Sequence, residues 1–248
     1  MLKALLHRKL PRGFWEADDV SDPDGNAHVE PTRREDPLTA SVFERLAYLP
    51  SSLTWDILRG ASKSFADELT LPANAPSGAP TWSFWPSLRP GVDGANKNRV
   101  EPDVLVSWPD ALLVIEAKHW GEQSEHQWVE QLRAVHAMPE HAGKRVWLIA
   151  VGGIAPHELE VRAAHVRCAI PHWLPGLLAM RWEDLRHIID EFRGPSRPHE
   201  QLAVLNDIAA ALDMWGYRKK TWFASLRPSD PLIQANKAMS VLHAWRVR

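Results

Sequence analysis

The stretch 101-EPDVLVSWPDALLVIEAK-118 decides the fold of this 248-residue chain. It contains two short apolar runs, residues 104–106 and 112–115, separated by the turn-forming sequence Trp-Pro-Asp. Apolar runs of this length around a proline-containing turn predict a β-hairpin, because proline presets the φ angle that the turn needs. Asp103 opens the first predicted strand and Glu116 closes the second. Antiparallel pairing would therefore bring these two carboxylates side by side.

The residues at the open end of this hairpin have a chemical use. Lys118 lies two residues beyond Glu116, and alternate residues of a strand point to the same face. Two carboxylates, a backbone carbonyl and water molecules form a hard oxygen site that suits Mg²⁺ or Mn²⁺. Such an ion can polarise a phosphoryl oxygen and activate a water, while a nearby lysine orients that water or neutralises developing charge. The pattern predicts metal-dependent chemistry at phosphorus.

The spacing E-P-D-x12-E-A-K resembles the PD-(D/E)xK nuclease superfamily, with Pro102-Asp103 as the PD and Glu116-Ala117-Lys118 as the ExK. The resemblance implies an α/β fold with a restriction-endonuclease-like αβββαβ core, in which a central mixed sheet is flanked by helices. It also implies a metal site formed by Asp103, Glu116 and the Ala117 carbonyl, with Lys118 as a catalytic residue.

The same resemblance implies a function. Members of the superfamily are phosphodiesterases that depend on Mg²⁺ (or Mn²⁺), most commonly act on DNA, and serve in restriction, antiviral defence or repair. Two alternatives stay open. The hairpin can be purely structural, or the chain can be a catalytically inactive nuclease-like subunit that binds nucleic acid or a partner protein in a larger complex.

Helical residues on either side of the motif are further candidates for the site. Glu44 lies on a helix predicted over residues 38–49, where many nucleases of the superfamily carry a glutamate that reaches the metal. Gln131, on the helix predicted after the motif, resembles the helical glutamine of the RecB-like branch. The tyrosine that this branch carries four residues later is replaced here by Val135. Gln127 lies one turn before Gln131 and is a second candidate. For all three polar residues the alternative is an ordinary helix surface.

Turn-rich segments divide the chain into three parts. Residues 1–37 are predicted to form an irregular arm, residues 38–194 the nuclease-like domain, and residues 195–248 a helical and basic extension. Apolar periodicity predicts helices and strands within these limits. The expected helices cover residues 38–49, 53–65, 124–138, 156–165, 182–192 and 201–215, and the expected strands cover 81–85, 104–106, 112–115, 145–151 and 177–180.

Basic residues in two places are candidates for nucleic-acid contacts, because lysine and arginine neutralise phosphates. Lys97 and Arg99 precede the hairpin, and Arg218, Lys219 and Lys220 begin a tail in which aromatic residues alternate with basic ones. Exposed aromatic rings can stack on bases. The alternatives are a solvated loop for the first pair and a packing or dimerisation segment for the tail.

Composition limits the class of protein. The formal net charge is −2, so the chain lacks the overall basic excess of a protein that coats DNA. Its single cysteine, Cys168, excludes an internal disulfide and a cysteine-based zinc site, which favours a reducing, cytoplasmic location. We expect no membrane segment and no signal peptide. The expected partners are nucleic acid, with DNA first, and a second copy of the chain or other subunits of a complex.

Overall fold

The computed structural model describes residues 32–64, 70–90, 99–170 and 175–218. The contacts divide the chain into two units, residues 1–218 and 219–248, and all described residues belong to the first. These residues form one six-stranded mixed sheet in the order β1-β6-β5-β4-β3-β2. The strands are β1 (Ser62–Ser64), β2 (Thr81–Phe84), β3 (Val104–Ser107), β4 (Ala111–Ala117), β5 (Arg145–Val151) and β6 (Gly176–Met180).

The sheet combines an antiparallel half with a parallel half. Strands β2, β3 and β4 are successive antiparallel neighbours, whereas β4, β5 and β6 run parallel. Each parallel connection carries a helix, α4 (Glu125–His136) and then α5 (Leu159–Ala169). Ends of parallel strands meet at one edge of a sheet, and ligands commonly bind outside the carboxyl ends. The carboxyl end of β4 is therefore the place to look for a site.

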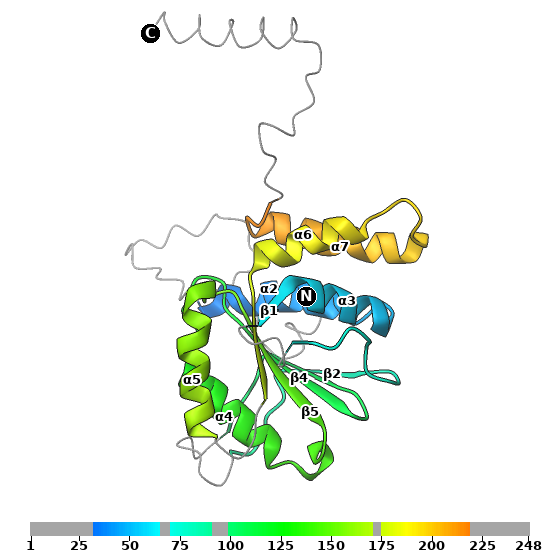
Figure 1. Ribbon diagram of the computed structural model, residues 1–248. Helices are drawn as coiled ribbons and strands as arrows, with labels where there is room; N and C mark the ends of the chain where they lie inside the picture. Colours follow the sequence, from blue (N-terminus) through cyan, green and yellow to red (C-terminus); the bar gives the residue numbers. More distant parts are fainter. Residues whose placement is uncertain (1–31, 65–69, 91–98, 171–174, 219–248) are drawn as a thin grey trace, which may run out of the picture. The chain divides into compact units, whose positions relative to one another are not determined.

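Helices cover both faces of the sheet (Figure 1). One face carries α4 and α5. The other carries α2 (Thr32–Leu46), α3 (Ser51–Ala61), α6 (Trp182–Phe192) and α7 (His199–Met214). Two short 3₁₀ turns, η2 (Pro139–His141) and η3 (Pro156–Glu158), complete the elements. The predicted α/β class, with a central mixed sheet flanked by helices, is confirmed.

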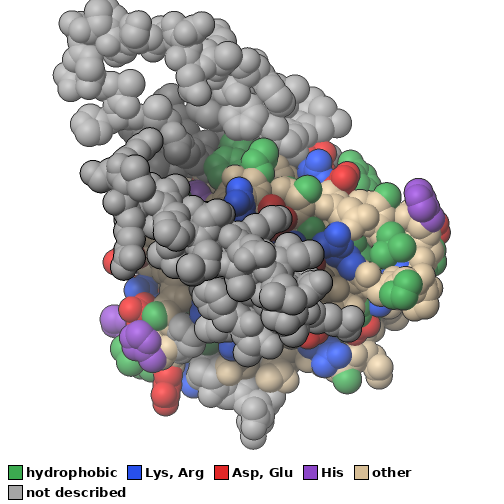
Figure 2. Space-filling view, turned by 90° about the horizontal axis from the view of Figure 1, so that it is seen from above, with side chains coloured by type: hydrophobic (Ala, Val, Ile, Leu, Met, Phe, Trp, Pro, Cys, Tyr) green, Lys and Arg blue, Asp and Glu red, His purple; other side chains and the backbone are tan. Residues whose placement is uncertain are grey.

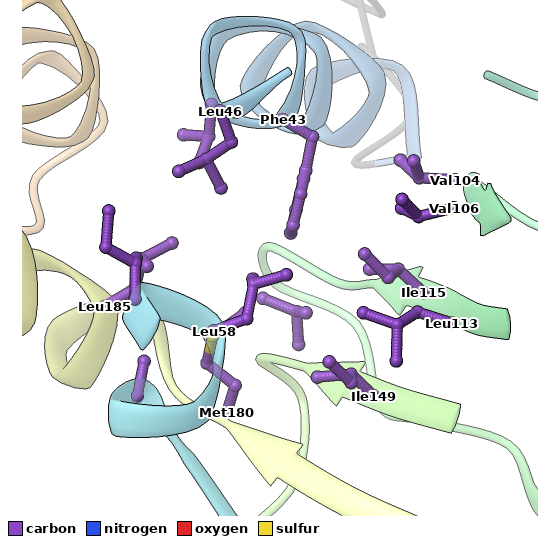
Figure 3. Close-up of a cluster of buried hydrophobic side chains, with 14 of the residues drawn as sticks. Phe43, Leu46, Leu58, Val104, Val106, Leu113, Ile115, Ile149, Met180 and Leu185 are labelled. Carbon is purple, nitrogen blue, oxygen red and sulfur yellow. The ribbon is translucent and has the colours of Figure 1, made fainter. Parts of the chain in front are cut away.

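Strand β4 is buried on both faces, and its side chains point alternately into two apolar cores on opposite sides of the sheet. Leu113 and Ile115 belong to the core beneath α2, α3, α6 and α7, whereas Leu112 and Val114 belong to the core beneath α4 and α5. Figure 3 shows the first core, in which side chains from strands, such as Ile115, meet side chains from helices, such as Phe43. By the same alternation, Glu116 faces the α4 layer.

Several elements lie where the sequence predicts them. The hairpin is present, and β5 and α6 have the predicted bounds. Helix α4 begins after Ser124, whose side chain accepts a hydrogen bond from the Gln127 amide at 3.4 Å. One strand was not predicted. Helix α3 ends at Ala61, and the three residues of β1 follow it where the predicted helix continued.

The predicted ends of the domain differ from the observed ones. Helix α2 begins at Thr32, so residues 32–37, which we predicted to be irregular, are helical and include Pro37. Pro37 is the sixth residue of the helix, so its missing N–H removes one intrahelical hydrogen bond, to the carbonyl four residues earlier. Helix α7, predicted to belong to the extension, packs against α2 and α6 through residues that are almost fully buried, Leu205, Ile208 and Leu212. The first unit thus extends to residue 218, and residues 219–248 lie outside the described part. None of the described helices has the length and apolarity to cross a membrane.

Candidate active site

The β3–β4 pairing brings Asp103 and Glu116 together. Val104 pairs with Ile115, so the next position outward sets Asp103 opposite Glu116, and directly opposed residues face the same side of a sheet. The Asp103 carboxylate is fixed at both oxygens. Oδ2 accepts from the Ala117 amide at 2.8 Å, and Oδ1 accepts from the Trp85 indole at 3.2 Å. The juxtaposition expected from the hairpin is present in the structure.

The Glu116 carboxylate is buried and surrounded by donors. Only 1% of the residue is exposed. Its Oε1 accepts from Lys118 Nζ and from Gln127 Nε2, each at 2.7 Å. Its Oε2 accepts from Gln131 Nε2 at 2.6 Å. Both candidate glutamines of α4 therefore contact Glu116, because α4 covers the face of β4 toward which Glu116 points.

Helix α2 supplies an acidic residue to the same cluster. Lys118 Nζ lies 3.1 Å from Glu35 Oε1, and Glu35 Oε2 accepts from the His119 amide at 3.2 Å. We predicted Glu44 for this role. Glu44 is buried, with 6% exposed, but it lies nine residues further along α2. Nine residues correspond to about 13 Å along the axis and to the opposite side of the helix. The glutamate that this helix places beside the lysine is Glu35.

The backbone around Lys118 is held by the loop after β5 and by α6. The Lys118 amide donates to the Val151 carbonyl at 2.7 Å, and its carbonyl accepts from the Trp182 indole at 2.9 Å. Gly152 has φ +66°, and a Cβ on it would lie 2.1 Å from the Lys118 oxygen. No other residue fits there. Gln123 ties the strand ends together by donating to three carbonyls, including that of Glu116 at 3.1 Å.

The charges of the cluster are not balanced. Burial, followed by the charge of Glu116, raises the pKa of Asp103 well above its ordinary value, and burial raises the pKa of Glu116. Burial alone would lower the pKa of Lys118, but Glu116, Asp103 and Glu35 outweigh it, so the lysine pKa is raised. Among the residues that the structure describes, one ammonium faces three carboxylates. This surplus of negative charge favours a bound cation.

The donors suit Mg²⁺ or Mn²⁺. Asp103 and Glu116 present oxygens on one face, and a carboxylate oxygen that accepts one hydrogen bond keeps a second lone pair. Gln131 Oε1 is buried and has no hydrogen-bond partner among the described residues. Within that same part of the chain, no group of three or more His, Cys, Asp or Glu side chains could hold a metal. Two carboxylates completed by waters and substrate phosphates are typical of Mg²⁺ sites. The Ala117 carbonyl remains a predicted ligand; the amide of the same residue binds Asp103.

Two of the predicted nucleic-acid contacts, Arg99 and Arg218, lie within the described residues. Arg99 has a side chain that is 62% exposed and pairs with Glu101 at 2.8 Å, and Arg218 is exposed at the end of the described chain. Figure 2 shows one face on which the visible basic and acidic side chains are intermixed. The other candidates lie outside the described residues: Lys97, Lys219 and Lys220.

Comparison with known proteins finds a similar protein but no family. No protein-family model matches the chain, and no solved structure matches it. The chain is 25% identical over 209 residues to "Uncharacterized protein PM0110" of Pasteurella multocida (strain Pm70), an alignment that covers 79% of this chain and 75% of that protein.

Proposed function

We propose that the protein is a nuclease that depends on Mg²⁺ or Mn²⁺ and hydrolyses phosphodiester bonds in DNA. One observation carries the proposal. Asp103 and Glu116 are paired at the carboxyl end of β4, and Lys118 lies in the same largely buried cluster, in which carboxylates outnumber cations among the described residues. Buried surplus charge is costly unless a ligand relieves it, so it marks a functional site more often than a structural one.

Each residue of the cluster has a role in the proposed reaction. Asp103 and Glu116 would hold the ion, which would supply Lewis acidity toward the phosphoryl oxygens and lower the pKa of a water. Gln127 and Gln131 hold the Glu116 carboxylate in one orientation by donating to both of its oxygens. In hydrolysis the water oxygen bonds to phosphorus, the bond to the leaving oxygen breaks, and that oxygen takes up a proton.

Lys118 acts in this scheme as a charged donor. Its raised pKa keeps the ammonium form, which can orient the attacking water or stabilise the negative charge that develops on the phosphoryl group. Glu35 is a positioning residue, because it contacts the lysine side chain and the following backbone amide rather than the predicted reacting atoms.

A second function has its own supporting observation. Both Glu116 oxygens already accept hydrogen bonds, and the Lys118 ammonium lies 2.7 Å from one of them. A cluster whose polar groups satisfy one another can persist without a metal. This favours an inactive nuclease-like subunit that binds nucleic acid or a partner protein. Metal-dependent cleavage separates the two functions.

Purified protein should be incubated with plasmid and with labelled single- and double-stranded DNA, in Mg²⁺, Mn²⁺ or EDTA. We expect cleavage in either metal and none in EDTA. Asp103→Ala and Glu116→Ala should each reduce the rate by at least about 10²- to 10³-fold, the order lost with one preorganised electrostatic group. Asp110→Ala is the matched control, since Asp110 lies at the exposed turn of the same hairpin and pairs with Arg145.

Circular dichroism and melting temperature verify that each variant is folded. Full activity in EDTA, or in both site variants, would contradict the proposed nuclease. Metal binding without cleavage of any tested substrate would favour the inactive subunit.

A further inference from the structure

Aromatic rings gather around the residue that follows the catalytic lysine. The His119 ring meets Trp120, Trp215 and Tyr217 edge to face, with centroid distances of 4.4, 5.4 and 5.5 Å. His119 Nδ1 and the Tyr217 hydroxyl form a hydrogen bond of 2.8 Å. Tyr217 lies just beyond α7 and also packs against Trp182 of α6, with the ring centroids 6.0 Å apart. The histidine ring is thereby fixed from several sides.

Trp120 differs from the other rings of this cluster because it is 71% exposed. Most of the large side chains in the described part of the chain are buried, and Trp55, Trp108, Trp128 and Trp182 are each less than 2% exposed. A single exposed apolar residue needs no explanation by itself. Trp120, however, is oriented by a fixed histidine and lies two residues from Lys118, at the site of the proposed chemistry.

We propose that Trp120, supported by His119, is a stacking platform for an unpaired nucleobase of the strand that is cut. The proposal rests on the proposed nuclease function and names its substrate class, DNA with single-stranded character at the site. Every base has a π face, so stacking on an exposed aromatic ring is independent of sequence. In a duplex those faces are stacked on neighbouring bases and become available only at the cost of unstacking.

The charge of the chain also favours an unpaired nucleobase as the group that Trp120 binds. A net charge of −2 and a carboxylate-rich site offer little general attraction for phosphates. A contact that does not depend on phosphate neutralisation would add affinity for a nucleic acid at this site, and stacking is such a contact. A platform next to Lys118 would hold the nucleotide beside the phosphate that the cluster is proposed to hydrolyse.

The test measures binding in EDTA by fluorescence anisotropy, with three probes: a labelled oligothymidylate, an abasic strand of the same length, and a duplex. Trp120→Ala should weaken binding of the oligothymidylate by roughly 5- to 150-fold, while the abasic strand, which keeps the phosphates, should bind as it does to wild type. Trp120→Phe should restore most of the affinity. The loss should persist at high salt, because stacking releases no counterions.

Tyr48→Ala is the matched control. Tyr48 is 67% exposed and lies beyond the C-terminal end of α2, whereas Glu35 lies in the first turn of that helix. This variant should bind all three probes like wild type. The platform would be overturned by unchanged oligothymidylate affinity in Trp120→Ala, by an equal loss on the abasic strand, or by an equal loss on the duplex.

The platform and the nuclease function can fail separately. If the protein cleaves DNA with Mg²⁺ but Trp120→Ala binds like wild type, the platform is wrong and the nuclease stands. If base-dependent binding requires Trp120 in a protein that cleaves nothing, the platform stands and the nuclease function is wrong.

Discussion

Two clusters of charged side chains in this protein differ in the balance between carboxylates and cations. Between α6 and α7, Arg186 pairs with Asp213 at 2.8 Å and also with Asp190, and Arg193 pairs with Asp190 at 2.8 Å. Two guanidinium groups thus face two carboxylates. At the end of β4, by contrast, the described part of the chain places one ammonium against the three carboxylates of the candidate active site.

This difference in charge balance distinguishes a cluster that stabilises the fold from a cluster that can bind a ligand. A balanced cluster fixes the packing of two helices and has no surplus charge to attract a ligand, although removal of Arg186 takes one partner from the largely buried Asp190. In the unbalanced cluster, burial followed by the charge of Glu116 raises the pKa of Asp103, and a cation from outside relieves the surplus of carboxylates. Changes in the two clusters should therefore appear in different measurements.

Among the changes that distinguish the two clusters, the largest effect is expected for Lys118→Ala. We predict a decrease of about 10²- to 10³-fold in the single-turnover cleavage rate at saturating metal, because a preorganised charge is removed from the reacting group. Metal affinity, measured by calorimetry, should not fall, since the ammonium occupies Glu116 and competes with the ion. Lys63→Ala is the control, because Lys63 is exposed and pairs with Asp184. A large loss of metal affinity with an unchanged rate would contradict the role given to Lys118.

Arg186→Ala should affect stability and leave the metal site in place. The Arg186 side chain is 7% exposed, and its removal leaves Asp190 and Asp213 without this partner. We expect a loss of about 3 kcal/mol in the free energy of unfolding, measured by urea denaturation. Arg181→Ala, which breaks an exposed pair with Asp184, should cost less than about 1 kcal/mol. Equal losses of unfolding free energy in Arg186→Ala and Arg181→Ala would contradict the stabilising role given to the Arg186 cluster.

Metal should stabilise the protein through the unbalanced cluster alone. At a concentration of Mn²⁺ about 100 times the Kd, we expect the free energy of unfolding to rise by about 2.7 kcal/mol. The melting temperature should increase in wild type and in Arg181→Ala, and should not change in Glu116→Ala. An equal increase of the melting temperature in Glu116→Ala would show that the metal binds at another site.

The smallest effects concern pH, and the two kinds of carboxylate should respond with opposite signs. The raised pKa of Asp103 means that the folded protein keeps a proton that the unfolded chain releases. The contribution of Asp103 to the free energy of unfolding therefore falls as pH rises from the ordinary carboxyl range through the raised pKa. The pKa of Asp184 is lowered, first by its hydrogen bond from Arg181, so its contribution is lost as pH falls through the lowered pKa.

These signs can be measured without metal, as the pH slope of the difference in unfolding free energy between wild type and each variant. Relative to Asp103→Asn, wild type should lose stability with rising pH; relative to Asp184→Asn, it should gain. A pH slope of the same sign for Asp103→Asn and Asp184→Asn would contradict these opposite pKa shifts. The Asp184 effect should stay below about 1 kcal/mol, because the pair is solvent-accessible.

Elements bounded by turns could be predicted from the sequence. The hairpin, β5 and α6 are apolar runs or amphipathic segments with polar or glycine boundaries, and their local signals agree with the fold. The convergence of Asp103 and Glu116 followed from the hairpin alone. Strand β1 could not be predicted, because three residues carry no periodicity, and its pairing with β6 decides its conformation.

The missed site residues depend on contacts between distant segments. Glu35 lies 83 residues from Lys118 in sequence, within a segment whose proline suggested an irregular arm. The acidic residue in a first helical turn was the one available signal, and it fits any helix start equally well. Tyr217 lies 98 residues from His119 and reaches it only because α7 packs onto α2 and α6. Such docking is decided by tertiary packing rather than by local pattern.

Crystals soaked in Mn²⁺ and measured for anomalous scattering test the central claim most directly. The account predicts a peak between Asp103 and Glu116, about 2.1 Å from an oxygen of each carboxylate, with the Lys118 ammonium withdrawn from Glu116. A peak at some other place, or none together with Lys118 still bound to Glu116, would contradict the assignment of this cluster as a metal-dependent active site.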